Sequence, residues 1–151
     1  MASKTPINHS VVVESTRSGI VRVCGRILFE LEANNFSQED IFATHLALEE
    51  AFLNATKHGS KMDPDKEIKV DYSVGSDKVE IFMTDEGDGF DPNVVPDPRY
   101  GENLYKTDGR GLLLMRSYMD VIEFNERGNR VRMVRYKEKP RLVETQGQTQ
   151  A

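Results

Sequence analysis

The chain has 151 residues, enough for one domain with a single sizeable core, and its 38% hydrophobic and 30% charged content is typical of globular proteins. The formal net charge of −5 argues against general binding to nucleic acid. No apolar run approaches the ~20 residues of a membrane helix, and the N-terminal segment lacks the apolar stretch of a signal peptide. We therefore expect a cytoplasmic protein with no direct nucleic-acid or membrane partner.

The first part of the chain alternates between polar segments and short apolar ones. Residues 1–9 are polar and expected to be flexible, and a valine-rich run at 10–14 predicts a short strand. Apolar residues then repeat every three or four positions, which predicts an amphipathic helix over about 18–33. Three residues near its start can cap the N-terminus: Ser15, Thr16 and Ser18.

Cysteine and histidine are too sparse to indicate a metal site. The single cysteine, Cys24, excludes an internal disulfide and lies on the apolar stripe of the first helix, so we expect it in the core. The three histidines, His9, His45 and His58, show no zinc-ligand spacing.

A second helix is predicted from Ser37, an N-cap followed by Asp40 three residues later, to Gly59, a natural C-cap. Glu50 and Asn54 are four residues apart on this helix, so their side chains share one row of its surface. A base and a metal ligand can sit together there. The alternative is an ordinary polar pair on a solvated face.

The neighbours of that row separate the two adjacent glutamates. Ala43 and Ala47 line the row of Glu50, and their small side chains leave room for a ligand. Glu49 points away from this row, beside His45 and Thr56, and is expected at the surface.

The hydrophobic period changes to two from residue 67. Runs at 67–74 and 79–83 flank a Gly-Ser-Asp turn and predict an antiparallel hairpin. The motif DEGDGFDP follows at 85–92, and a proline-containing stretch continues to Asp108. A connection that long is typical of a functional lid.

The last part of the chain predicts a helix and a second hairpin. Gly109-Arg110-Gly111 opens a helix that reaches Met119, strands follow at 121–126 and 131–137, and the tail 138–151 is expected to be disordered. Basic residues recur along this hairpin and are expected to form a solvated face: Arg127, Arg130, Arg132, Arg135 and Lys137.

This order of elements predicts an α+β two-layer sandwich. The helices do not alternate with single strands, so they cannot act as regular βαβ crossovers. We expect a mostly antiparallel mixed sheet of about five strands, with the helices on one face, in a single domain over residues 10–137.

Two glycine-containing motifs have a clear chemical use. Asp85 ends a strand, so its carboxylate can accept a hydrogen bond from an exocyclic amine such as that of adenine, while Gly87 and Gly89 let the backbone turn. Gly109 and Gly111 allow the amides at a helix start to approach phosphate oxygens. Each motif alone is usually a simple turn or helix start.

Together, E-x-x-x-N on a helix, D-x-G-x-G after a strand, a lid and G-x-G at a helix start resemble the nucleotide-binding pattern of the GHKL (Bergerat-fold) ATPase and kinase superfamily. EEAFLNATKHG, DEGDGFDP and GRGLLLMRSYMD are most similar to the anti-sigma-factor serine/threonine kinases of bacterial partner-switching systems. The resemblance covers roughly residues 10–137.

The resemblance implies a role for each matching residue. Glu50 would be the general base, and Asn54 would ligate the Mg²⁺ that bridges the ATP phosphates. Asp85 would bind the adenine amino group, with Gly87 and Gly89 shaping the adenine pocket. The phosphates would be held beneath the lid by Gly109, Arg110 and Gly111.

The resemblance also implies partners. These would be a sigma factor, which the protein would sequester, and an anti-anti-sigma factor of the STAS type, which it would phosphorylate on serine or threonine; a homodimer is expected. The alternative is a catalytically inactive, nucleotide-dependent binding module. The family commonly has Gly-Thr in the final hairpin, where this chain has Gly128-Asn129.

Overall fold

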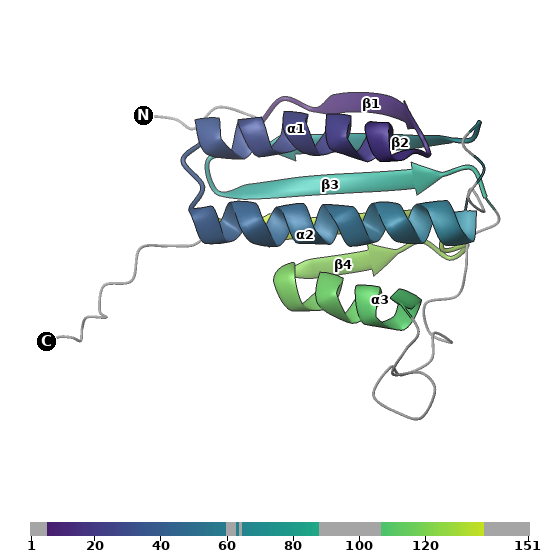
Figure 1. Cartoon of the computed structure of the whole chain (residues 1–151). Coiled ribbons are helices and arrows are strands. Elements are labelled where there is room, and N and C mark those ends of the chain that lie inside the picture. Colours follow the sequence, from purple (N-terminus) through teal and green to yellow (C-terminus); the bar gives the residue numbers. More distant parts are fainter. Residues whose placement is uncertain (1–5, 60–62, 64, 88–106, 138–151) are drawn as a thin grey trace, which may run out of the picture.

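A computed structural model describes residues 6–59, 63, 65–87 and 107–137 (Figure 1). The elements are, in chain order, β1 (His9–Glu14), α1 (Arg17–Ala33), α2 (Gln38–Asn54), η1 (Ala55–Gly59), β2 (Glu67–Val74), β3 (Lys78–Asp85), α3 (Thr107–Tyr118), β4 (Val121–Phe124) and β5 (Arg130–Tyr136). Three predictions concern segments that lie wholly or largely outside these residues: the flexible N-terminus, of which only residues 6–9 are described, the lid and the C-terminal tail.

The strands form one five-stranded sheet in the order β1-β2-β3-β5-β4. Every pairing among the described strands is antiparallel, so the predicted mixed character of the sheet is not found there. Alternate residues of β2 and β3 are buried, and the three helices lie on one side of the sheet (Figure 1). The predicted α+β two-layer architecture is confirmed.

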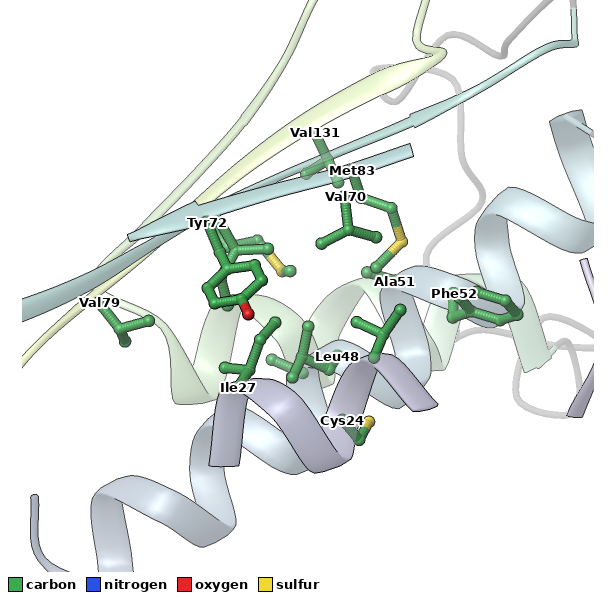
Figure 2. Packing of buried hydrophobic residues seen from close by; sticks show 14 of the residues in the cluster. Cys24, Ile27, Leu48, Ala51, Phe52, Val70, Tyr72, Val79, Met83 and Val131 are labelled. Carbon is green, nitrogen blue, oxygen red and sulfur yellow. The ribbon is translucent and has the colours of Figure 1, made fainter. Parts of the chain in front are cut away.

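The core lies between α1, α2 and the sheet. Figure 2 shows Ile27 of α1 and Leu48 of α2 directed toward Val70 and Tyr72 of β2. Ile27, Leu48 and Val70 are completely buried. Among the helices of the described residues, none is both long and apolar enough to span a membrane.

The start of α1 is fixed against β1. Thr16 is the N-cap, and its hydroxyl accepts a hydrogen bond from the amide of Gly19 at 3.1 Å. A Cβ atom at Gly19 would lie 2.1 Å from the carbonyl oxygen of Glu14. Only glycine therefore allows the first turn of α1 to pack this closely on the end of β1.

The buried face of α2 differs from the prediction in one respect. Ala43 and Ala47 are each only 1% exposed, so the alanine row does not leave an open surface for a ligand. α3 packs against α2, and small side chains on the buried face of a helix permit such close packing. Phe42, also on α2, is 60% exposed and meets the ring of Tyr118 edge-on.

The second helix also ends earlier than predicted. The regular α-helix stops at Asn54, and the next five residues, Ala55–Gly59, form a π-helical turn rather than a continuous helix capped by Gly59. Such wider turns often accompany functional sites, because they redirect the side chains around them.

One arginine of the last hairpin is part of the interior rather than of a solvated face. Arg135 of β5 donates to the carboxylate of Asp40 at 2.8 Å and to the carbonyl of Tyr118 at 2.6 Å. Asp40 is completely buried. This pair joins the N-terminus of α2 to the end of α3 and to the sheet.

Candidate functional site

Asp85 lies at the end of β3, as predicted, and is 9% exposed. Its Oδ1 accepts a hydrogen bond from the amide of Gly87 at 2.8 Å. Its backbone amide donates to the carbonyl of Asn129 at 2.9 Å, which fixes the strand end against the β4–β5 turn. The carboxylate is therefore held in a defined orientation at the end of the central strand of the sheet.

Asn54 is the last residue of α2 and is 7% exposed. Its Nδ2 donates a weak hydrogen bond to the sulfur of Met115 at 3.8 Å. Asn54 and Asp85 line one small cavity of about 20 Å³, together with Met115 of α3 and Gly128 and Asn129 of the β4–β5 turn. The structure thus brings together two predicted site residues from elements that are distant in the sequence.

Glu50 lines a different and larger cavity. This cavity, about 380 Å³, lies between the start of α1 and the end of α2, and Thr16, Arg17 and Thr56 also line it. Burial raises the pKa of Glu50 above its ordinary value, the neighbouring Glu49 raises it further, and Lys57 opposes both. A half-buried carboxylate with a raised pKa is a stronger base than an exposed one.

Glu49 is not the plain surface residue that the helical spacing predicted. Its Oε2 lies 3.2 Å from Nε2 of His45, as the spacing implied, and its Oε1 accepts from Arg17 at 3.2 Å. It also lines the same cavity as Glu50. Both adjacent glutamates therefore face the space between α1 and α2.

The glycine residues of the site are only partly described. Gly87 lies next to Asp85, as predicted, whereas Gly89 lies outside the described residues. Gly109, Arg110 and Gly111 are in the first turns of α3, which begins at Thr107 rather than after the glycines. The amides of Gly109 and Arg110 are among the first four of the helix, which have no carbonyl partner within it.

The β4–β5 turn contributes a residue that sequence reasoning did not select. Asn129 donates from Nδ2 to the carbonyl of Asp85 at 3.4 Å, and its Oδ1 accepts from Asn125 at 2.7 Å. Gly128 has φ of 74°, which L side chains rarely adopt. The sequence pointed to Asn129 only through the resemblance, because Gly128-Asn129 stands where the family commonly has Gly-Thr.

The described residues fit ATP and Mg²⁺ in their chemistry. Among them, no donor occupies the amide oxygen of Asn54, and such an oxygen is a suitable ligand for Mg²⁺. The buried carboxylate of Asp85 is an acceptor, and its chemistry matches an amino group. The cavity between them has space for about one water molecule.

This fold and this arrangement of residues define a histidine kinase-like ATPase domain: the sequence pattern of that family matches residues 14–135, and the chain belongs to the family. Three relatives are each named serine-protein kinase RsbW. The protein of Bacillus licheniformis is 29% identical, covering 94% of this chain and 87% of the relative. Those of Listeria innocua and Bacillus subtilis are 32% and 31% identical, covering 67% of this chain and 69% and 68% of the relatives. The resemblance to GHKL kinases is confirmed.

Proposed function

We propose that the chain is an ATP-dependent serine/threonine protein kinase that acts as an anti-sigma factor. Its substrate is a STAS-type anti-anti-sigma partner, and its sequestered partner is a sigma factor. The family assignment supports the kinase activity, and the relatives named serine-protein kinase support a protein substrate. A cytoplasmic homodimer that regulates transcription is part of this proposal.

The observation that carries the proposal is that two separate cavities lie at the end of α2, each lined by different candidate residues. Asn54 and Asp85 line one cavity, and Glu50, one turn earlier, lines the next. A nucleotide bound over the first cavity would direct its phosphates toward the end of α2. A substrate hydroxyl entering from the second cavity would then meet Glu50.

Phosphoryl transfer needs a base, an acceptor and a defined phosphate position. The acceptor hydroxyl forms a bond to the γ-phosphorus, the bond from that phosphorus to the bridging oxygen breaks, and ADP leaves with the electron pair. The hydroxyl proton passes to the carboxylate of Glu50, whose pKa is raised by burial. Bound Mg²⁺ supplies positive charge for the phosphates, and Asn54 is the described residue that would hold it.

An inactive binding module is the second candidate function. The two candidates differ in whether they require Glu50. A module that only binds nucleotide needs Asn54 and Asp85 but has no use for a half-buried base with a raised pKa beside a cavity. This contrast favours the kinase.

Calorimetric titration of the purified chain with ATP, with and without Mg²⁺, tests the nucleotide site. We expect micromolar binding that weakens without Mg²⁺, and we expect Asn54→Ala to bind equally weakly in both conditions. Glu50→Gln, on the same helix, is the matched control and should bind as the wild type does. Failure to bind millimolar ATP, in a chain shown to be folded by circular dichroism, would overturn the proposal.

A further inference from the structure

A cluster of three side chains of the types that can bind a metal ion lies between α1 and α2. Cys24 of α1 and His45 and Glu49 of α2 each offer one ligand atom, and these atoms all lie within 4.8 Å of one another. None of the three lines the cavity that holds Asn54 and Asp85. Figure 2 places Cys24 apart from the side chains that gather beneath the sheet.

The geometry of the cluster is close to that of a tetrahedral metal site. With metal–ligand distances of about 2.0–2.3 Å, two ligands of one tetrahedral ion are about 3.5 Å apart. Nε2 of His45 and Oε2 of Glu49 are already 3.2 Å apart. The widest pair in the cluster must close by little more than ~1 Å, which side-chain rotation alone can supply.

The contacts and the solvent exposure of the three residues bear on whether an ion can bind. Glu49 uses its two oxygens separately: Oε1 pairs with Arg17, and Oε2 lies next to Nε2 of His45. The His45 side chain is 45% exposed and that of Glu49 is 30% exposed, so two of the three ligand residues are accessible to solvent, whereas Cys24 is buried.

We propose that Cys24, His45 and Glu49 form a binding site for a divalent transition-metal ion of the Zn²⁺ class, with a fourth position open to water. One sulfur, one nitrogen and one oxygen ligand favour such an ion over Mg²⁺, which prefers oxygen alone. Cys24 binds such an ion as a thiolate, so the thiol proton must leave when the ion binds.

Binding would join the two helices beside the cavity of Glu50. Each ligand is supplied by a regular part of its helix, so the ion acts as a clamp between α1 and α2. The ion binds the folded state and stabilises it by mass action. Because Glu49 also lines the cavity of Glu50, the ion would fix one wall of that cavity. The site does not depend on nucleotide binding or on the kinase proposal.

Cobalt(II) titration of the reduced, tag-free chain of 151 residues, followed by Zn²⁺ calorimetry, tests this site. We expect one Co²⁺ per chain, with a near-ultraviolet thiolate-to-cobalt charge-transfer band, and displacement of Co²⁺ by Zn²⁺ but not by millimolar Mg²⁺. Cys24→Ala should abolish the band. His45→Gln should weaken Zn²⁺ binding by at least about 10-fold.

Two control variants separate this site from adventitious binding. Glu39→Gln changes an exposed carboxylate on the same helix, and His9→Gln changes a histidine on β1, so both should bind Zn²⁺ as the wild type does. Since His45 is partly exposed, its variant should fold even if Cys24→Ala does not. Absence of the charge-transfer band in the wild type, or undiminished Zn²⁺ affinity in His45→Gln, would overturn the proposal.

Discussion

The two cavities at the end of α2 are built in opposite ways. Around Asp85 the groups are buried and held by backbone hydrogen bonds between β3 and the β4–β5 turn. Around Glu50 the charged groups are half-buried or exposed, with the Arg17 side chain 79% exposed. The first region is suited to recognising one shape of ligand, and the second is suited to chemistry on a partner that arrives from solvent.

We expect the largest effect on the rate of phosphorylation from a substitution in the second region, around Glu50. Glu50→Gln removes the proposed base but preserves the shape of the side chain, so we expect phosphorylation of a cognate STAS-type partner to fall by about 10²–10⁴-fold while ATP binding is unchanged. Glu49→Gln is the matched control in the same cavity and should lower the rate by less than about 10-fold. Radiolabel transfer from ATP measures both. Equal losses in the two variants would mean that the cavity's charge, and not a particular base, drives the reaction.

The wall of the second region depends on one glycine. Gly19→Ala places a Cβ 2.1 Å from the carbonyl oxygen of Glu14, so β1 and α1 must move apart. We expect a loss of about 3 kcal/mol in the free energy of unfolding. Gly25→Ala on the same helix meets nothing within 4 Å and should stabilise the chain by up to about 1 kcal/mol. Urea unfolding measures both, and similar values for the two variants would contradict the close-packing argument.

The first region should show its role through affinity. Asp85→Asn keeps the size of the side chain but replaces an acceptor oxygen with a donor, so we expect ATP and ADP to bind about 10–100-fold more weakly. The loss should be the same with and without Mg²⁺, unlike that of Asn54→Ala. Calorimetry with both nucleotides decides this. A loss confined to ATP would place Asp85 at the phosphates instead of the adenine.

The fold was predictable where the chain follows one period for long enough. The apolar spacing of α1, the Ser37 cap of α2 and the alternating residues of β2 and β3 all identified their elements correctly. Asp85 at a strand end followed from the same patterns. The π-helical turn after Asn54 was not predictable, because helical periodicity does not distinguish α from π spacing over one turn.

Features that depend on contacts between distant elements were missed. Ala43 and Ala47 read as an open row, because nothing in the sequence shows that α3 packs against α2. The linear positions of Cys24, His45 and Glu49 do not show that they come together, because packing of α1 on α2 is what places their ligand atoms within 4.8 Å of one another. The arrangement of Asn129 beside Asp85 likewise required the register of the sheet.

Asn129 gives the smallest predicted effect and the finest test of the first region. Asn129→Ala removes one side-chain contact at 2.7 Å and one at 3.4 Å, but the 2.9 Å bond from the Asp85 amide to its carbonyl remains. We expect a loss of about 0.5 kcal/mol in stability and a change of less than about 3-fold in ATP affinity.

Asn125→Ala is the matched control for Asn129→Ala, since Oδ1 of Asn125 accepts from two backbone amides of the turn, at 3.0 and 3.1 Å. It should cost more, about 1 kcal/mol, because both amides lose their acceptor. Thermal unfolding compares the stability of the two variants, and ATP titration compares their affinity for the nucleotide. If Asn129→Ala lowers ATP affinity by more than 10-fold while its stability is unchanged, Asn129 contacts the nucleotide directly. The nucleotide site would then include the β4–β5 turn as well as the end of β3.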